Sequence, residues 1–218
     1  MKKIIAFSLW GNNPKYTIGA VKNSKIASEI YPGWIPRFYV SKNVDKDITR
    51  QLQENNSEII IMPNEGDWTG MFWRFEAASD PDVEAMISRD TDSRLTLRES
   101  AAVNEWLLSG NLFHIMRDHP WHGAPIMGGM WGVRAPLLRD INKLIEKYTK
   151  GNFWQVDQNF LKEVIYPIVR NTSHVNDDFF EKKPWPMPRT NLEFVGQVFD
   201  ENEETVKEHL DVLRIHIS

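Results

Sequence analysis

Short apolar runs alternate with segments of helical spacing in the first half of the chain, and this alternation constrains the fold more than any other feature of the sequence. Strands are predicted at residues 4–9, 37–40, 59–62 and 83–88, with 4–9 and 59–62 apolar enough to be fully buried. Helices are predicted at residues 16–30, 45–54, 69–78 and 97–108, the second of them capped by Asp45. Strands joined through helices form crossover connections, so we predict an α/β fold whose mostly parallel sheet carries helices on both faces.

The second half of the chain has weaker periodicity. Residues 113–125 hold three of the six histidines and are expected to form a long functional loop. Helices are predicted at 137–148 and 156–164, an irregular segment at the three prolines of 184–188, and a short strand at 193–199. The tail at 200–218 begins acidic and ends apolar, as in a docking helix or a segment that leads to further domains of a longer protein.

Composition excludes several classes of protein. The 218 residues show no repeat and no linker, so we expect a single domain over residues 1–218. The balance of 26 basic and 30 acidic side chains gives a net charge of -4, which argues against a nucleic-acid partner. With no cysteine, a metal would be held by carboxylates and histidines, and such ligands favour hard cations.

The chain carries no sequence signal for a membrane. Its longest apolar runs fall well short of the roughly 18 to 20 residues that a membrane span needs. The apolar run at residues 4–10 is too short for a signal peptide and leads into a loop without a cleavage site. We therefore expect a cytoplasmic protein with no membrane span, located in the host cytoplasm if the chain is viral.

Two aspartates directly follow the predicted strand at residues 83–88. In an extended chain, side chains two positions apart point the same way at about 6 to 7 Å, so Asp90 and Asp92 can face one ligand. The carboxyl end of a strand in a parallel sheet is where such folds bind ligands, and Mg²⁺ or Mn²⁺ there would join carboxylates to a diphosphate. The alternative is a set of solvated ion pairs with Arg89 and Arg94.

Four segments together resemble one enzyme family. SRDTDSRL at residues 88–95, with Arg98-Glu99 and Glu105-Trp106 after it, looks like the DxD region of nucleotide-sugar-dependent glycosyltransferases with the GT-A fold. FSLWG at 7–11 resembles their first-strand nucleotide segment, MGGMWG at 127–132 their glycine-rich donor-sugar segment, and DQNFL at 157–161 the DQxxL helix of small bacterial and viral sugar transferases. The resemblance covers residues 4–199 and is closest to the compact glycosyltransferase domains of large algal (chlorella) viruses.

The resemblance implies a GT-A-like, Rossmann-like sheet and a hexosyltransferase that depends on Mn²⁺ or Mg²⁺. Its donor would be a nucleotide-sugar, in the first place a UDP-sugar, and its acceptor a glycan or glycoprotein. Asp92 is implied as a direct metal ligand and Asp90 as a metal or ribose contact, with His174 as the candidate third ligand. The alternative for His174 is a solvated histidine in a polar loop.

The resemblance also implies the contacts of the nucleotide-sugar. They are Ser8, Leu9, Trp10 and Tyr16 for the uridine, Arg74 for the diphosphate, Gly128, Gly129 and Trp131 for the donor sugar, and His119 for the donor sugar or the diphosphate, with Trp121 as a further sugar contact. The glycines would let the backbone approach the donor closely. Large aromatic side chains also fill protein cores, and that alternative is strong for Trp10.

Asp157 is the candidate catalytic base. An inverting glycosyltransferase needs a carboxylate that takes the proton of the acceptor hydroxyl, and the apolar neighbours of Asp157 would raise its pKa through desolvation. A retaining enzyme would use the same residue as an acceptor contact, and a purely structural reading makes it a carboxylate that favours a helix N-terminus. The acceptor site itself is expected from residues 113–125 and 171–188.

Two other functions compete with a glycosyltransferase. A haloacid-dehalogenase-type phosphohydrolase also places an Asp-x-Asp after a buried strand, and Asp177-Asp178 would supply its late acidic pair. A noncatalytic sugar-binding module would explain the nine tryptophans without Asp90 or Asp92. Metal-dependent binding of a nucleoside diphosphate separates the glycosyltransferase from both.

Overall fold

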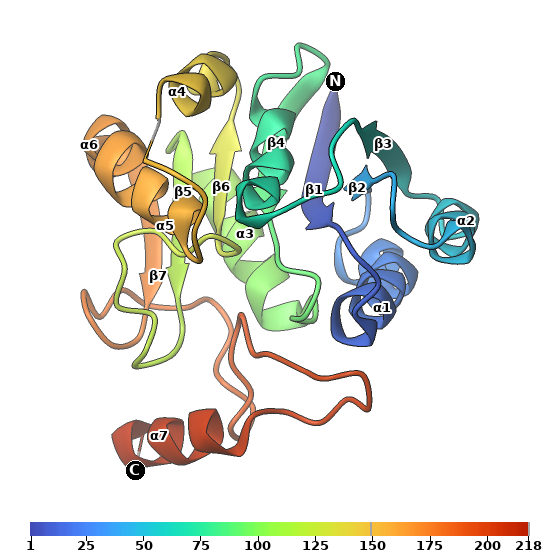
Figure 1. Cartoon of the computed structure of the whole chain (residues 1–218). Coiled ribbons are helices and arrows are strands. Elements are labelled where there is room, and N and C mark those ends of the chain that lie inside the picture. Colours follow the sequence, from blue (N-terminus) through green and yellow to red (C-terminus); the bar gives the residue numbers. More distant parts are fainter. Residues whose placement is uncertain (149, 218) are drawn as a thin grey trace.

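The computed structural model describes residues 1–148 and 150–217, and its strands form one seven-stranded sheet (Figure 1). The strands are β1 (Lys2–Leu9), β2 (Ile35–Ser41), β3 (Glu58–Met62), β4 (Val83–Ser88), β5 (Phe113–Arg117), β6 (Trp131–Arg134) and β7 (Ser173–Asp177). Their order in the sheet is β3-β2-β1-β4-β6-β5-β7, and β6 alone runs antiparallel to both of its neighbours. The prediction of a mixed, mostly parallel sheet is confirmed.

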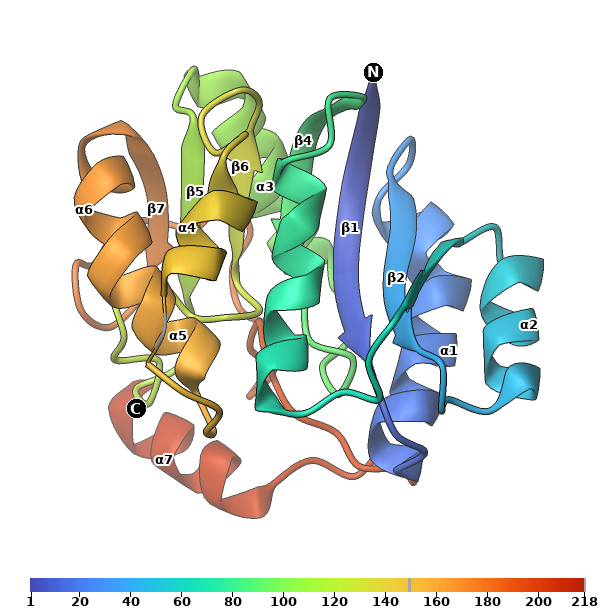
Figure 2. The same ribbon diagram turned by 45° about the horizontal axis from the view of Figure 1, so that its top comes forward.

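Helices cover both faces of this sheet. One face carries α1 (Pro14–Ile30), α2 (Lys46–Glu54) and α3 (Leu97–Ser109); the other carries the 3-10 helix η1 (Trp68–Ala78), α4 (Ile141–Lys147), α5 (Val156–Phe160), the π-helical turn η2 (Leu161–Ile165) and α6 (Tyr166–Val169). A 3-10 turn, η3 (Arg170–Thr172), leads into β7. Figure 2 shows α4, α5 and α6 in front of the sheet and α1 and α3 behind it.

The central strand β1 is apolar on both faces because both faces are covered. Ile4 and Ala6 pack into the core beneath η1, and Ile5 and Phe7 pack into the core beneath α1 and α3. Successive side chains of a strand point to opposite faces, so an uninterrupted apolar run is the expected sequence of a doubly covered strand.

The direction of the strands determines where a ligand can bind. The chain leaves β1 for β2 and β3 on one side and returns to β4 on the other side of β1, so the connections diverge between β1 and β4. In open α/β sheets this switch point opens a crevice at the carboxyl ends of the strands. The carboxyl ends of β1, β4, β5 and β7 lie at this same edge of the sheet.

Four local predictions are wrong. The segment 59–62 forms β3 but is not fully buried, because β3 ends the sheet and leaves Ile60 and Ile61 40% and 58% exposed. Residues 113–117 are the fully buried strand β5, and only the remainder of 113–125 is loop. The predicted strand at 193–199 is a series of turns, because Gly196 adopts a φ of 81° that an extended chain does not allow. The strand β7, in residues 171–188, was not predicted.

The tail forms the helix α7 (Lys207–Ile217), which agrees with a docking helix. It lies away from both helical layers, at the edge of the sheet toward which β1 points (Figures 1 and 2). Leu213 is its buried anchor. Within the described part of the chain, no helix combines the length and the apolarity needed to cross a membrane.

Candidate active site

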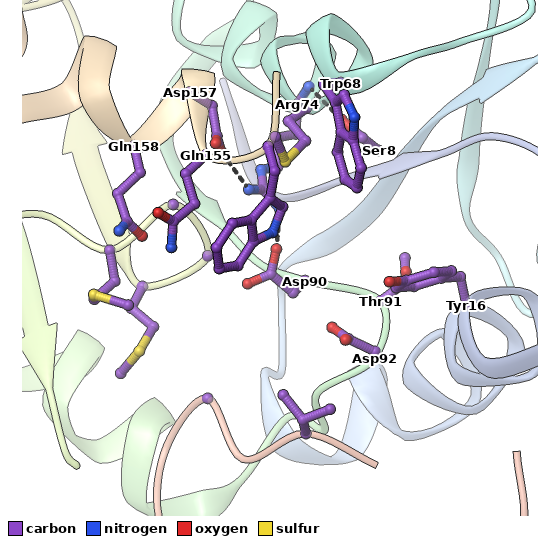
Figure 3. A pocket seen from close by; sticks show the side chains of 18 of the residues that line it. Ser8, Tyr16, Trp68, Arg74, Asp90, Thr91, Asp92, Gln155, Asp157 and Gln158 are labelled. Atoms are coloured by element: carbon purple, nitrogen blue, oxygen red, sulfur yellow. Dashed lines mark hydrogen bonds and ion pairs between the residues drawn. The ribbon is translucent and has the colours of Figure 1, made fainter. Parts of the chain in front are cut away.

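A cavity of about 630 Å³ opens at the carboxyl edge of β1 and β4 (Figure 3). The ends of these strands and the start of α1 form one wall, η1 and the start of α5 form another, and the glycine-rich loop before β6 lies between them. Twelve of the predicted site residues line it: Ser8, Leu9, Trp10, Tyr16, Arg74, Asp90, Asp92, His119, Trp121, Gly128, Gly129 and Asp157.

The loop that carries Asp90 and Asp92 is fixed by buried polar contacts from α1. The side-chain amide of Asn23, which is fully buried, donates to the Ser93 carbonyl at 2.8 Å and accepts from the Leu95 N–H at 3.1 Å. From the other side, the Phe199 N–H donates to the Asp92 carbonyl at 2.8 Å. The two carboxylates therefore sit on a rigid support, as a preorganised ligand site requires.

Each of the two aspartates pairs with a cation of the chain. Asp90 forms an ion pair with Arg74, and Asp92 Oδ2 lies 2.8 Å from Lys15 Nζ. The Asp90 side chain is 45% exposed, whereas that of Asp92 is only 15% exposed. Burial, and then the charge of Asp90, raises the pKa of Asp92 despite the contact with Lys15. The two negative charges therefore disfavour one another, and a bound cation would relieve this repulsion.

Arg74 is a buried side chain that lines the cavity and connects several of its other residues. Its Nη2 donates to Asp157 Oδ2 at 2.9 Å, and its Nη1 donates to the Arg89 carbonyl at 3.1 Å in addition to pairing with Asp90. Its backbone N–H donates to Ser8 Oγ at 3.0 Å, which ties η1 to the end of β1. Burial lowers the pKa of Arg74, but the carboxylates of Asp90 and Asp157 outweigh it and raise that pKa. Arg74 thus links the DxD loop to α5.

Asp157 is almost fully buried in the first turn of α5. Burial raises its pKa, and the Asp90 charge adds to this effect while Arg74 opposes it. A carboxyl group with a raised pKa beside a cavity is suited to accept a proton from a bound ligand. The turn before Asp157 is unusual, because Gln155 has a left-handed φ of 66° without being glycine.

Two glycines make room for these carboxylates. A Cβ at Gly128 would lie 2.6 Å from Asp157 Oδ2 and 3.0 Å from Arg74 Nη2. A Cβ at Gly129 would overlap the Asp90 carboxylate, since it would lie 2.5 Å from Asp90 Cγ. Both glycines are therefore required by close approach to side chains, and neither has a positive φ.

Trp131 and His174 lie outside the cavity, and both expectations need correction. Trp131 follows the glycines into β6, where it is fully buried and stacks on Phe113 with ring centroids 5.3 Å apart. His174 lies on β7 at the edge of the sheet and its Nε2 is 3.0 Å from Glu105. Trp131 is a core residue because strand alternation turns it toward the sheet face. His174 instead pairs with Glu105 of α3.

His119 lines the cavity, but its side chain is hydrogen-bonded to the C-terminal helix α7. Its Nε2 donates to the carbonyl of His209 on α7 at 2.9 Å, and its Nδ1 accepts from the Trp121 N–H at 3.1 Å. Both ring nitrogens are used, so His119 positions α7 against the cavity. Trp121 is half exposed and also lines the cavity, as expected for a sugar contact. The loop 113–125 therefore contributes to this site, whereas no described residue of 171–188 does.

Sequence reasoning missed several residues of the site. The cavity is also lined by Trp68, Met71, His122, Trp154, Gln155, Gln158, Phe194 and His209. Gln158 belongs to the DQNFL segment, Trp154 and Gln155 lie directly before it, and His122 lies in 113–125, so these four carried a usable signal. Lys15 does not line the cavity but pairs with Asp92. Trp68, Met71, Phe194 and His209 come from segments far apart in sequence, and only the fold brings them together.

No protein-family model and no curated protein matches this chain, but solved structures do. The structure of a glycosyltransferase involved in the glycosylation of the major capsid of PBCV-1 matches with a TM-score of 0.54 at 15% identity, over 82% of each chain. Glucosyl-3-phosphoglycerate synthase from Mycobacterium tuberculosis, solved with Mg²⁺ and UDP, matches with a TM-score of 0.51 at 12% identity, over 80% of this chain and 68% of its own. The same enzyme with Mn²⁺, UDP and phosphoglyceric acid gives 0.51 at 13%, over the same shares.

The chain has a GT-A-like glycosyltransferase fold. At these identities the likeness establishes the architecture alone, and the predicted relation to the algal-virus domains stays a prediction. In this GT-A-like fold, the Asp-x-Asp segment lies at the switch point of the sheet, where the cavity opens.

The residues present fit a hard divalent cation only together with a ligand. Among residues 1–148 and 150–217, no group of three histidine or acidic side chains could hold a metal ion. Asp90 and Asp92 offer carboxylate oxygens, and Mg²⁺ and Mn²⁺ are commonly shared between one or two carboxylates and substrate phosphates. The mutual repulsion of the two aspartates is an observation in favour of such an ion.

Asp177 and Asp178, the second acidic pair that a phosphohydrolase would need, lie outside the cavity. Asp177 accepts hydrogen bonds from the backbone N–H groups of residues 179–181 and pairs with Arg117 at 3.0 Å. Asp178 pairs with Arg98 and Arg189. Neither lines the cavity, so the two acidic pairs which that mechanism needs do not share a site.

Proposed function

We propose that this chain is a glycosyltransferase that depends on a divalent metal ion and transfers a hexose from a nucleotide-sugar to a hydroxyl group of a glycan or glycoprotein. One observation carries the proposal. Asp90, Asp92 and Asp157 line a single cavity at the switch point of a GT-A-like sheet, and Arg74 joins Asp90 to Asp157. The glycosyltransferase structures of the same fold support it.

UDP is the proposed nucleotide of the donor. Ser8, Leu9, Trp10 and Tyr16 form the wall at the end of β1 and the start of α1, and the flat Tyr16 ring is 39% exposed there. An aromatic face and backbone groups suit a uracil ring. The mycobacterial enzyme of similar fold was solved with UDP and Mg²⁺ or Mn²⁺, which supports the same nucleotide and cations here.

Asp90 and Asp92 are the proposed ligands of Mn²⁺ or Mg²⁺. The bound ion would neutralise the charge that develops on the departing diphosphate. Arg74 and Lys15 are fixed cations beside the same carboxylates, and they add to this electrostatic stabilisation. The bond between the anomeric carbon and the diphosphate oxygen breaks, and the acceptor oxygen forms the new bond to that carbon.

The proton of the acceptor hydroxyl must go to a base, and Asp157 is the proposed one for an inverting reaction. Its Oδ2 is held by Arg74, so the carboxylate has a fixed position at the cavity wall. Its raised pKa brings it closer to that of a base working near neutral pH. In a retaining reaction Asp157 would instead hold the acceptor.

Calorimetric titration of UDP into the protein, with Mn²⁺ and with chelator, tests the proposal. We expect binding with Mn²⁺, loss of binding with chelator, and loss in Asp92→Asn. Asp47→Asn is the matched control, because Asp47 is an exposed carboxylate of α2 that pairs with Arg50. Absence of UDP binding by the wild-type protein, or binding that ignores both chelator and Asp92→Asn, would refute the proposed function.

A further inference from the structure

The cavity has two chemically different ends. Tyr16 and Asp92 lie at one end, Gln155, Asp157 and Gln158 lie at the other, and Asp90 and Arg74 separate them (Figure 3). The first end belongs to the nucleotide and metal in the proposed function. The second end is free to take the other substrate, and its side chains indicate what that substrate is.

Aromatic and amide side chains dominate the second end. Trp154 is 66% exposed although it lines a cavity, where a large indole would normally be covered. Gln155 and Gln158 reach the same space with amide groups that both donate and accept hydrogen bonds. Flat apolar faces beside amides match the apolar faces and the hydroxyl groups of a sugar ring.

The backbone presents Trp154 and Gln155 to the cavity in succession. Gln155 adopts the left-handed conformation without being glycine, a state that costs roughly 1 kcal/mol or more and is concentrated at functional sites. The loop is held by Asn152, whose side-chain amide donates to Asp67 Oδ2 at 2.7 Å, and by the Val156 N–H, which donates to the Phe153 carbonyl at 3.2 Å. These two hydrogen bonds thus fix the turn that leaves Trp154 exposed.

Positive charge is missing from this end. Arg74 is the only arginine or lysine among the described residues that line the cavity, and its guanidinium already holds Asp90 and Asp157. The three lining histidines add none, since burial lowers the pKa of His119, His122 and His209. A phosphate or carboxylate placed here would meet the Asp157 carboxylate with no free cation to bind it.

We propose that this end of the cavity is the acceptor subsite and that it binds a neutral sugar ring. This inference rests on the proposed glycosyltransferase function. Trp154 supplies the flat face for the ring, and Gln155 and Gln158 bind its hydroxyl groups. Phosphorylated or carboxylated acceptors are excluded because Arg74, the cation that pairs with Asp157, also holds Asp90 and is not free for a further anion.

The test compares neutral acceptors with anionic ones. UDP release is measured with UDP-hexose donors and Mn²⁺ on a panel of neutral mono- and disaccharides, with glucose 6-phosphate set against glucose and 3-phosphoglycerate as a second anion. We expect transfer to neutral sugars and none to the anions. Trp154→Ala should raise the KM for the neutral acceptor about tenfold and Gln158→Ala about threefold to tenfold, as lost stacking and hydrogen-bond contacts predict.

Two neighbours serve as matched controls. Phe153 and Asn159 lie in the same segment but do not line the cavity, so Phe153→Ala and Asn159→Ala should leave the acceptor KM within twofold. Calorimetric binding of UDP with Mn²⁺ should be unchanged in all four variants, which separates the acceptor subsite from the donor site.

Each result decides one of the two claims. If the wild-type protein binds no UDP, the proposed function fails and the subsite fails with it. If UDP binds with Mn²⁺ but the anionic acceptors are preferred, or no neutral sugar is used, or the Trp154 and Gln158 variants behave like their controls, the acceptor inference is overturned while the donor site stands.

Discussion

A single methyl group at Gly129 should disable the DxD loop without unfolding the protein. In Gly129→Ala the new Cβ would lie 2.5 Å from Asp90 Cγ and 3.0 Å from the Asp90 backbone nitrogen. Gly129 has no positive φ, so alanine meets no backbone restriction there and the whole effect is steric. Because the Asp90 side chain is 45% exposed, it can swing away from the new methyl group.

The expected cost follows from two opposing effects. Overpacking at a buried position costs about 1 to 3 kcal/mol. Replacing glycine by alanine at a permissive backbone stabilises by about 0.4 to 1 kcal/mol. The free energy of unfolding should therefore fall by at most about 2.6 kcal/mol, with about 1.3 kcal/mol at the middle of the two ranges. A displaced Asp90 should weaken binding of UDP with Mn²⁺ about 10- to 100-fold, the usual effect of disturbing the residues that support a metal ligand.

Gly123 provides the control. A Cβ at Gly123 would meet only the Phe180 ring, at 3.7 Å, so Gly123→Ala should leave UDP binding unchanged and raise the free energy of unfolding by about 0.4 to 1 kcal/mol. A Cβ at Gly128 would meet Asp157 Oδ2 at 2.6 Å and Arg74 Nη2 at 3.0 Å, so Gly128→Ala should slow transfer by displacing the proposed base. Urea unfolding and calorimetry measure both quantities. Wild-type UDP affinity in Gly129→Ala would refute the role given to this contact.

Three further predictions concern stability. Burial lowers the pKa of His122 to about 3, so between about pH 6.5 and pH 3 only the unfolded chain binds this proton, and stability is lost as the pH falls through that range. In His122→Asn the free energy of urea unfolding should therefore depend less on pH, by up to about 1.4 kcal/mol per pH unit. An unchanged slope of this free energy against pH would contradict the prediction. Glu99→Leu removes the carboxylate that lies 3.0 Å from the buried Arg89 guanidinium, so the free energy of urea unfolding should fall by about 3 to 5 kcal/mol. A fall below about 1 kcal/mol would show that the Arg89 charge is accommodated elsewhere. UDP at about 100 times its Kd with Mn²⁺ should raise the free energy of unfolding by about 2.7 kcal/mol, and a gain that survives chelator or Asp92→Asn would argue against metal-linked binding.

The sequence was sufficient where local pattern and burial agree. The run before Gly11 and the Asp45 cap each predicted an element correctly, because a doubly covered strand is apolar throughout and an aspartate side chain accepts the backbone N–H two residues on, as Asp45 does from Asp47 at 2.8 Å. The Asp-x-Asp segment, the two glycines and Asp157 came together because their segments meet at one edge of the sheet.

Prediction failed where polar residues are buried in pairs. The strands β5 and β7 read FHIMR and SHVND, and neither looks like a buried strand alone. In the sheet, His114 Nε2 bonds to Asn176 at 2.8 Å and Arg117 pairs with Asp177 at 3.0 Å, so each polar side chain finds a partner on the strand beside it. These pairings join residues about 60 positions apart, and no local pattern records them.

The opposite failure occurred at residues 193–199, where a good strand pattern is not a strand. Phe194 and Val195 are buried but belong to no strand: Phe194 lines the cavity and contacts His209 of the tail, and Val195 packs against Ala102, Met116 and Met130. Gly196 turns the chain with its positive φ, and a Cβ there would lie 2.7 Å from Met130 Sδ. Apolar composition predicted burial correctly, and the glycine was the signal against extension.

The charges around the cavity bear on the binding of both proposed substrates, the nucleotide-sugar donor and the acceptor. Asp90, Asp92 and Asp157 contribute three negative charges when ionised, against Arg74 and Lys15, which leaves an excess of one negative charge before any ligand arrives. A nucleoside diphosphate adds more negative charge to this site, so its binding requires a divalent cation. The same excess acts on the acceptor: Arg74 cannot serve an anionic acceptor without abandoning Asp90 or Asp157, whereas a neutral sugar requires no cation at all. The proposed metal dependence at one end of the cavity and the proposed neutrality of the acceptor at the other thus have a common electrostatic origin.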